Sequence, residues 1–324
     1  KECRKYAESQ IAGQKKDFKR LGVIGDWDNP YLTMNFKTEA DTLRALGKVI
    51  SNGHFIRGLK PVYWCMDCQS ALAEAEVEYA DVKSDSIYVR FSSTDDEKLL
   101  SIFGAQGEGS GPISCVIWTT TPWTLPSNMA ICLNEQLKYS LVQVKCADKE
   151  ERYILATDLV ENVMKDCGIE EYSVIGTSVS GKALEHLKFA HPFLNRLSMI
   201  VLGAHVTLEA GTGCVHTAGG HGLDDYNVCV KYGIDIYNPV DAEGCFKDDV
   251  EYFAGLNVLK ANPKVIEVLK EKGALVKALS ISHSYPHCWR CKKPIIFRAT
   301  PQWFCSVDAF KDEACAACDD VKWY

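Results

Sequence analysis

A stretch of short, β-type apolar runs enclosed by two Cys-x-x-Cys pairs restricts the fold more than any other feature of this sequence. The runs lie between about residues 80 and 260 and read SIYVRF, ISCVIWTTT, YSLVQVKC, RYILA, YSVIGTSV and SMIVLGAHV. Polar or glycine-containing turns separate them, which is typical of a mainly β domain. We therefore expect an α+β protein that contains a barrel-like β domain with peripheral helices.

The first cysteine pair, Cys65 and Cys68, precedes the β-rich stretch, and the second pair, Cys288 and Cys291, follows it. If the β domain is inserted between them, both pairs lie where it joins its base. Four thiolates from two such turns make a closed tetrahedral zinc site. The long separation in sequence leaves a second interpretation open, in which the pairs are unrelated thiols.

A third pair, Cys315 and Cys318, lies near the end of the sequence within KDEACAACDD, and we interpret it as ordinary thiols. A thioredoxin-like redox role is a weaker hypothesis, because no βαβ pattern surrounds any of the pairs. The chain has 15 cysteines and starts without an apolar, signal-like stretch. We therefore expect metal ligands and free thiols rather than a disulfide framework.

The sequence suggests three parts: residues 1–80 with the first cysteine pair, residues 81–280 as the inserted β domain, and residues 281–324 with the second pair. Thr38 and Asp41 have approximately the spacing of a capping box at the start of a helix. Apolar spacing and end signals predict helices at 38–53, 157–167, 224–232 and 263–272, and a further short helix near the end of the chain.

Composition excludes several classes of protein. Apolar residues make up 47% of the chain and charged residues 24%, which excludes a disordered or collagen-like chain. No apolar run is long enough to span a membrane, so we expect a soluble, cytoplasmic protein. The formal net charge of −7 neither predicts nor excludes an RNA partner, because local basic patches can still bind phosphate.

Three adjacent threonines, Thr119 to Thr121, end an apolar run directly before Pro122. Proline ends a strand and biases the preceding residue towards an extended conformation. Strand alternation then places Thr119 and Thr121 on one face and Thr120 on the other, so that hydroxyls border the mouth of a pocket. The alternative is a β-branched strand that only turns at this point.

A glycine-rich loop, residues 211–222, leads into the start of a helix at Asp224 and Asp225. It has neither the GK[ST] ending of a Walker loop nor G-x-G-x-x-G spacing. Its glycines allow a ligand to approach the backbone, and Asp225 in the first helical turn can hold an ammonium group. Taken singly, Asp225 also fits a helix-start acid, and His216 and His221 fit structural histidines.

Together, these motifs resemble the editing-domain region of isoleucyl-tRNA synthetases, which are class I aminoacyl-tRNA synthetases. The resemblance covers nearly the whole chain and rests on GDW, PYLTM, WCMDC, TTTPWTLP, the glycine-rich loop through Tyr226, and HSYPHCWRCKKPIIFRATPQWF. The last segment is more similar to the isoleucyl enzymes than to their valyl and leucyl relatives. The resemblance implies an editing domain inserted on a zinc-ribbon-like base and on partial catalytic-domain segments.

This family needs a second site for a physical reason. One methylene separates isoleucine from valine by only about 1–3 kcal/mol in a hydrophobic pocket, and this family is the standard example of that limit. The resemblance implies an editing site that hydrolyses valyl-tRNA(Ile) and excludes the isoleucyl product by size. The expected partner is the acceptor end of tRNA(Ile) carrying valine, bound by a monomer.

The motifs with which these synthetases form aminoacyl-adenylate, of the types His-Ile-Gly-His and Lys-Met-Ser-Lys-Ser, do not occur in this sequence. The resemblance therefore implies an internal part of a longer ligase whose ATP site lies outside this chain. We expect no aminoacylation by this chain alone.

The resemblance also assigns roles to individual residues. It implies that Asp225 pairs with the substrate α-ammonium group and that Thr120 and Thr121 take part in the catalytic step. It places His216 beside the amino-acid side chain as a steric gate against isoleucine. The further substrate-binding positions that it implies are Trp118, Thr119, Thr124 and Asn128.

For the four flanking cysteines, the resemblance implies a structural Zn²⁺ site like that of some family members. One departure is Gly219, because family members usually have proline there, and we expect a more mobile loop. Two other functions stay open: a zinc-stabilised tRNA-binding module without hydrolytic activity, and a thiol-based redox protein. The basic residues considered for tRNA contact, with solvated surface as the alternative, are Lys15, Lys16, Lys19, Arg20, Lys292, Lys293 and Arg298.

Overall fold

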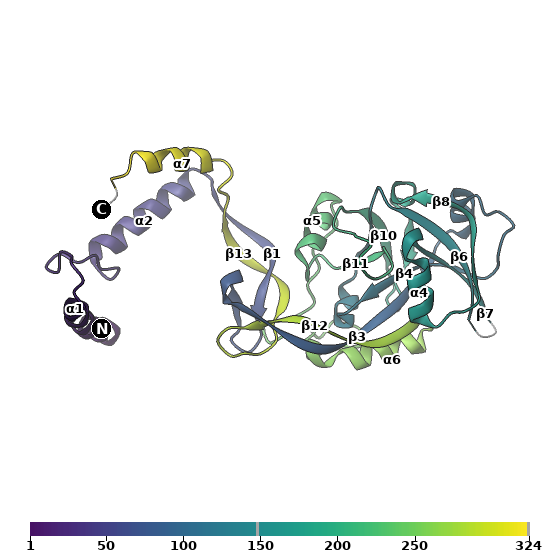
Figure 1. Cartoon of the computed structure of the whole chain (residues 1–324), viewed down its shortest axis with the longest axis horizontal. Helices are drawn as coiled ribbons and strands as arrows, with labels where there is room; N and C mark the ends of the chain where they lie inside the picture. Colours follow the sequence, from purple (N-terminus) through teal and green to yellow (C-terminus); the bar gives the residue numbers. More distant parts are fainter. Residues whose placement is uncertain (147–148, 323–324) are drawn as a thin grey trace. The chain divides into compact units, whose positions relative to one another are not determined.

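Strands from the β-rich stretch pair into one large mixed sheet in the computed structural model, which describes residues 1–146 and 149–322 (Figure 1). The sheet has the order β11-β5-β10-β9-β3-β4-β7-β6-β8, with β12 paired to β3. Its strands are β3 (Val77–Ser93), β4 (Ile113–Thr119), β5 (Ala130–Leu133), β6 (Lys138–Cys146), β7 (Lys149–Ala156), β8 (Tyr172–Ser180), β9 (Lys188–Ala190), β10 (Leu197–Leu202), β11 (Val215–Thr217) and β12 (Leu275–Cys288). Each of the six predicted β-type runs contributes a strand, and the expected α+β class is confirmed.

The sheet curls because β11, at one end of the strand order, packs against β4 in its middle. Most neighbouring strands are antiparallel, whereas β5 with β10 and β4 with β7 are parallel. The largest side chains with almost no exposure fill the space enclosed in this way, and they are Tyr139, Phe91, Phe103, Phe189, Phe246 and Phe253. This curling brings the end of β4 close to the glycine-rich loop, residues 211–222, which contains β11.

Contacts divide the chain into two units, Leu59–Pro301 and a smaller one made of Lys1–Gly58 with Gln302–Tyr324. The division of the chain at residues 80 and 280 stays a prediction. In the larger unit the helices are α3 (Asp96–Phe103), α4 (Val160–Cys167), α5 (Leu223–Lys231) and α6 (Asn262–Glu271). The helices expected at 157–167, 224–232 and 263–272 are therefore confirmed within a residue or two, although the first begins with a 3₁₀ turn, Thr157–Leu159.

The described residues of the smaller unit form three helices, α1 (Glu2–Arg20), α2 (Phe36–Ser51) and α7 (Lys311–Asp319), none of which has a buried residue. The sequence patterns did not predict α1, because its polar sequence has no apolar stripe. The helix expected at 38–53 is confirmed as α2 but begins two residues earlier, because the side chain of Asn35, and not Thr38, accepts a hydrogen bond from the Lys37 N–H at 3.0 Å. No helix in the described ranges is long and apolar enough to cross a bilayer.

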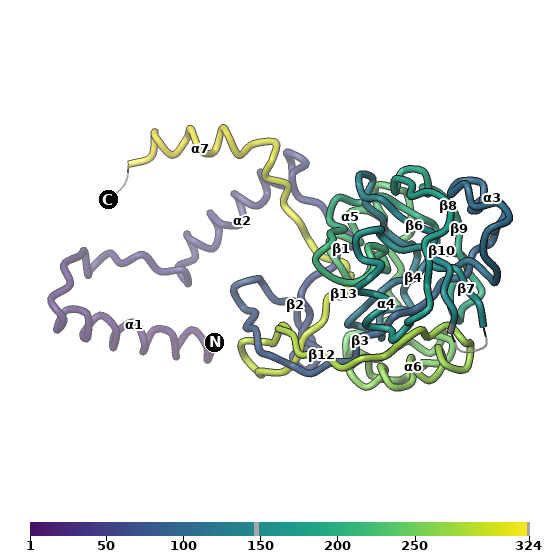
Figure 2. The backbone as a smooth tube through the Cα atoms, turned by 45° about the vertical axis from the view of Figure 1, so that its right-hand side comes forward, coloured from purple at the N-terminus to yellow at the C-terminus, as the bar shows by residue number. Residues whose placement is uncertain are grey.

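A long antiparallel ribbon of β3 and β12 connects the cysteine turns to the large sheet, and the two strands run side by side in Figure 2. The pairing runs from Val77 opposite Cys288 to Val89 opposite Leu275. Beside the cysteine turns, a second sheet joins β1 (Phe55–Cys65) to β2 (Ser70–Leu72) and β13 (Ile296–Cys305) in the order β13-β1-β2. Strands that flank the β domain in sequence therefore lie together.

Tyr139 on β6 anchors the beginning of the glycine-rich loop. Its side chain is fully buried, and its hydroxyl donates to the Gly213 carbonyl at 2.8 Å and accepts from the Asn134 N–H at 2.9 Å. Gly213 has φ +74°, and a Cβ there would lie 2.3 Å from Cβ of Ala156. The loop is thus held by a hydrogen bond at a position that only glycine occupies without strain.

We expect Tyr139→Phe to lower the free energy of unfolding by about 1–3 kcal/mol, because the Gly213 carbonyl and the Asn134 N–H would each lose a buried partner. Urea denaturation measures this change. The matched control is Tyr172→Phe, since Tyr172 on β8 is 40% exposed. Equal midpoints for the two variants would contradict the role assigned to Tyr139.

Candidate functional site

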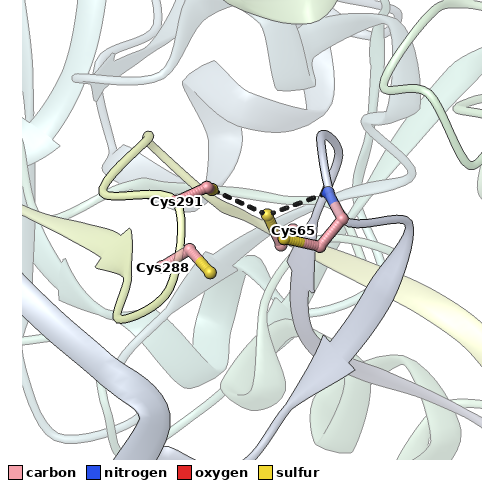
Figure 3. A group of neighbouring side chains, drawn as sticks. Cys65, Cys288 and Cys291 are labelled. Carbon is pink, nitrogen blue, oxygen red and sulfur yellow. Dashed lines mark hydrogen bonds between the residues drawn. The ribbon is translucent and has the colours of Figure 1, made fainter.

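The two cysteine pairs that flank the β domain meet in space. Sγ atoms of Cys65, Cys68, Cys288 and Cys291 all lie within 4.8 Å of one another. Figure 3 shows Cys65 on one turn facing Cys288 and Cys291 on the other, and the Sγ atoms of Cys65 and Cys291 are 3.5 Å apart. The prediction that the pairs come together is therefore confirmed, and the cluster can hold a metal ion.

Both cysteine turns have the same backbone conformation, which fits metal binding. The residue after each second cysteine has a positive φ, +48° at Gln69 and +60° at Lys292. In the first turn the Cys68 N–H donates to the Cys65 sulfur at 3.4 Å. Burial alone would raise the pKa of Cys288, but the backbone N–H groups of Cys291 and Arg290 outweigh it and lower that pKa to about 7.

Geometry tests the fit of a metal more directly. Four sulfurs about 2.3 Å from a tetrahedral Zn²⁺ ion lie about 3.8 Å from one another. The upper limit of 4.8 Å for the four sulfurs and the 3.5 Å separation of the Cys65 and Cys291 sulfurs bracket that value. The donor set and its spacing therefore fit a four-thiolate metal site.

A second site lies where the curled sheet brings β4, β11 and the start of α5 together. A hollow of about 350 Å³ opens there. Its lining combines the threonine run with part of the glycine-rich loop and comprises Trp118, Thr119, Thr120, Thr121, Thr124, His205, Thr207, Ala210, Val215, His216, Ala218, His221 and Asp225. Seven of the eight sequence-predicted catalytic and substrate-binding residues line this hollow, and Asn128 lies behind it in contact with His216.

The threonine run forms one wall of the hollow. β4 ends at Thr119, and a 3₁₀ turn begins at Pro122. The Thr119 and Thr121 hydroxyls are 3.3 Å apart, as expected for residues on one side of a strand. Because the strand ends before Thr120, alternation does not remove that residue from the wall, and it borders this hollow and a neighbouring one.

His216 on β11 is a neutral and firmly held part of the wall. Its Nδ1 lies 2.7 Å from the Asn128 side-chain nitrogen, and its Nε2 lies 2.9 Å from the Thr124 hydroxyl. Burial lowers the pKa of His216 to about 3, with further contributions from His221 and Arg196. The ring therefore has no proton-accepting role near neutral pH, but its bulk limits the space beside it.

Asp225 lies in the first turn of α5 and presents a half-buried carboxylate to the hollow. It accepts a hydrogen bond from the Ala218 N–H at 2.9 Å. Burial raises the pKa of Asp225, although that hydrogen bond and nearby His205 oppose the shift. Salt bridges recorded for residues 1–146 and 149–322 do not involve Asp225, so a cation that enters the hollow would find a carboxylate able to pair with it.

Gly219 lies in the tight turn between His216 and Asp225 and is buried. A Cβ at this position would lie 2.9 Å from the Cys229 sulfur and 2.9 Å from Cδ1 of Ile236. Helix α5 therefore packs directly against the loop backbone. The greater mobility expected from Gly219 stays a prediction.

Among the polar residues of the hollow, the sequence patterns missed His205 and Thr207. Both follow β10 in a loop without a motif of its own, so no local signal could have found them. His221 also lines the hollow, and its Nδ1 bonds to the Phe297 carbonyl at 2.9 Å, which fits the structural reading of this histidine.

The basic residues near the second cysteine pair make contacts within the protein. Lys292 forms an ion pair with Glu78 at 2.7 Å, and Lys293 pairs with Asp67. Arg298 lies over the Trp64 ring. These contacts favour the surface interpretation of those residues over direct contact with RNA phosphate.

Comparison with known proteins defines the class first. Residues 1–324 match the family model described as tRNA synthetases class I (I, L, M and V), and the chain belongs to this family. Its relatives then narrow the assignment: isoleucine–tRNA ligase of Thioalkalivibrio sulfidiphilus is 55% identical over 325 residues, which cover 100% of this chain and 34% of that protein. The enzyme of the same name from Erwinia tasmaniensis is 58% identical over 307 residues, 94% of this chain and 32% of that protein.

The chain therefore spans about 34% of the length of the curated relatives that it matches over its whole length. The resemblance to isoleucyl enzymes drawn from the sequence motifs is confirmed. Among solved structures, the editing domain of Plasmodium falciparum cytosolic leucyl-tRNA synthetase matches with TM-score 0.46 and 9% identity over 62% of this chain and 100% of that one. The GlLeuRS-CP1 structure matches with TM-score 0.45 and 14% identity, over 59% of this chain and 97% of that one.

Buried histidines predict how stability depends on pH. Burial lowers the pKa of His191 and His216 to about 3 and that of His221 to about 4. Since the unfolded chain binds protons with a pKa of about 6.5, it gains protons that the folded chain does not. The free energy of unfolding should be highest above about pH 6.5 and fall towards lower pH, by up to about 1.4 kcal/mol per pH unit for each histidine.

Urea denaturation at about pH 7.5 and about pH 5.5 measures this loss. His186→Gln is the control, because it removes an exposed histidine, with 63% side-chain exposure, and keeps the three buried rings. The same free energy of unfolding at both pH values would show that the three rings titrate normally.

Proposed function

We propose that this chain is the editing part of an isoleucine–tRNA ligase and hydrolyses the aminoacyl ester of valyl-tRNA(Ile). One observation carries the proposal: a single hollow combines an unpaired carboxylate, a run of threonines and a neutral histidine. Family membership and the isoleucine–tRNA ligase relatives support the choice of substrate class. In this proposal the partner is the acceptor end of tRNA(Ile).

Asp225 binds the α-ammonium group of the aminoacyl ester. The carboxylate lines the hollow and accepts a backbone hydrogen bond from Ala218. Burial, which raises the pKa of this carboxyl, makes pairing with a cation more favourable than at the surface, because less water competes for the charge. The ammonium group then fixes one end of the substrate, and the ester lies against the threonine wall.

The reaction needs positioning more than covalent chemistry, because an aminoacyl ester is already activated. Water attacks the ester carbonyl, the bond from the acyl carbon to the terminal ribose oxygen breaks, and that oxygen leaves as a hydroxyl with a proton from the water, so that free valine and tRNA are released. Polar groups of Thr120 and Thr121 orient the ester and the water. The low pKa of His216 excludes this ring as the general base. In this mechanism no acyl-enzyme forms on threonine or cysteine.

His216 supplies the size selection. Hydrogen bonds hold its ring on both nitrogens, so the ring does not turn aside at small cost when a larger side chain enters. Isoleucine, which is longer than valine by one methylene, then meets the ring. Trp118 and Thr119, on the same wall, and Thr124 and Asn128, bonded to the ring, complete the substrate-binding set.

The four-cysteine cluster holds a structural Zn²⁺ ion in this proposal. Cys65, Cys68, Cys288 and Cys291 supply a closed set of thiolates from two similar turns. A bound ion would fix these turns at the end of the β3 and β12 ribbon and would leave no coordination position for substrate. We further propose that the chain acts as a monomer in the cytoplasm, with ATP used only at a site outside it.

Asp225→Asn tests the editing assignment. Loss of the charge that pairs with the ammonium group should lower kcat/KM for deacylation of valyl-tRNA(Ile) by about a hundredfold or more, measured as release of labelled valine. The matched control is Asp224→Asn, because Asp224 precedes Asp225 in the same helical turn and is exposed. Equal activity of both variants would refute the role of Asp225.

The wild-type chain supplies the remaining comparison in the same assay. Valyl-tRNA(Ile) should be hydrolysed faster than isoleucyl-tRNA(Ile), because His216 restricts the larger side chain. If tRNA binds but neither ester is hydrolysed above background, the chain is a binding module and the proposed hydrolysis is wrong.

Metal content tests the cysteine cluster. The purified chain should contain about one zinc ion, and Cys291→Ser should reduce this content and lower the thermal stability. Cys318→Ser is the control, since Cys318 is exposed on α7 and lies outside the cluster. Folded wild-type chain without bound metal would overturn the zinc assignment.

A further inference from the structure

A series of buried hydrogen bonds runs behind the hollow and reaches β10, a strand outside both the threonine run and the glycine-rich loop. Ser198 on β10 is fully buried, and its hydroxyl donates to Oδ1 of Asn128 at 2.6 Å. Asn128 contacts Nδ1 of His216 at 2.7 Å, and Nε2 of His216 contacts the Thr124 hydroxyl at 2.9 Å. Thr124 in turn donates to the carbonyl of Thr121 at 2.8 Å.

Backbone carbonyls contact both Thr124 and Asn128 and indicate where the protons of these two side chains lie. The Thr121 carbonyl only accepts, so Thr124 uses its single O–H there and accepts a hydrogen bond from Nε2–H of His216. At the other end the Ala130 carbonyl accepts from the Asn128 side-chain nitrogen at 2.9 Å. That nitrogen therefore also faces Nδ1 of His216, which carries no proton.

The donor and acceptor roles along this series of hydrogen bonds determine the tautomer of His216. Only the neutral ring with its proton on Nε2 satisfies both neighbours, because a proton on Nδ1 would face the N–H of Asn128. Within residues 1–146 and 149–322, the hydrogen bond to Oδ1 of Asn128 comes from the Ser198 hydroxyl. The serine therefore completes the set of bonds that holds the amide in this orientation.

We propose that Ser198 is a specificity-determining positioning residue, which holds the Asn128 amide so that His216 keeps one tautomer and one ring position in the wall of the hollow. This inference rests on the proposed editing function. Without the serine hydroxyl, Oδ1 of Asn128 is a buried acceptor without its donor, and the amide gains a reason to rotate. Rotation would present the amide oxygen to Nδ1, move the ring proton and release the Thr124 bond to Thr121. The Ala130 carbonyl opposes a complete turn, because the amide oxygen would then face it, so the Ser198 and Ala130 contacts together hold the amide.

Ser198→Ala tests the inference with two measurements. In the full chain labelled with ¹⁵N-histidine, nitrogen–proton correlation spectra report which ring nitrogen carries the proton, and a His216→Gln sample identifies the His216 signals. We expect the Nε2–H pattern in the wild-type chain and its loss or mixing in Ser198→Ala. Deacylation assays should show that the preference for valyl-tRNA(Ile) over isoleucyl-tRNA(Ile) falls about three- to tenfold.

Two further variants separate positioning from general loss of stability. Ser140→Ala removes another fully buried strand hydroxyl, which lies 2.9 Å from Oγ1 of Thr157 and 2.9 Å from the Ser178 hydroxyl, outside the lining of the hollow. It should keep the wild-type tautomer and preference. Ser198→Thr keeps the hydroxyl and should restore both.

An unchanged His216 tautomer together with an unchanged preference in Ser198→Ala would overturn the inference. An equal loss of preference in Ser140→Ala would also overturn it, because the effect would then be one of stability. If the wild-type chain hydrolyses neither ester, the proposed function fails, and the His216 tautomer in Ser198→Ala alone then upholds or overturns the positioning by Ser198.

Discussion

The antiparallel pairing of β3 with β12 is the interaction on which the larger unit depends. One end of this ribbon pairs Val77 with Cys288, beside the metal-binding cluster, and the other end enters the large sheet where Val89 faces Leu275. The cysteines thus clamp the strands that enter and leave the β domain. Since the intervening chain forms the curled sheet, the geometry of the hollow depends on two strands whose far ends meet beside four cysteine sulfurs.

The chemistry that the hollow can support depends on two side chains, the buried ring of His216 and the carboxylate of Asp225. Hydrogen bonds satisfy both nitrogens of His216, so burial makes this ring a neutral and shaped surface. Asp225 differs from His216, because its carboxylate faces the hollow and accepts a hydrogen bond from the backbone N–H of Ala218. The fixed ring of His216 is suited to selecting a substrate by the size of its side chain. The carboxylate of Asp225 is suited to binding a positively charged group at the other end of the substrate.

Sequence patterns predicted the strands and most helices, because periodicity, caps and turn residues act locally. They also predicted the cysteine cluster, since thiol pairs at both borders of an inserted domain suggest a shared metal. They missed α1, which has no apolar stripe, and His205, which faces Asp225 only because the sheet curls. Ser198 gave no signal either, because its partner Asn128 becomes its neighbour only through the parallel pairing of β5 with β10.

The ribbon of β3 and β12 also affects how the chain folds while it is being synthesised. Strand β3 leaves the ribosome long before β12, so its edge towards β12 has no native partner until Leu275–Cys288 has been synthesised. Contacts so distant in sequence form slowly, and an unpaired edge invites pairing with other chains. Polar side chains in this part of β3, such as Lys83 and Asp85, would oppose pairing of the exposed β3 edge with other chains during translation.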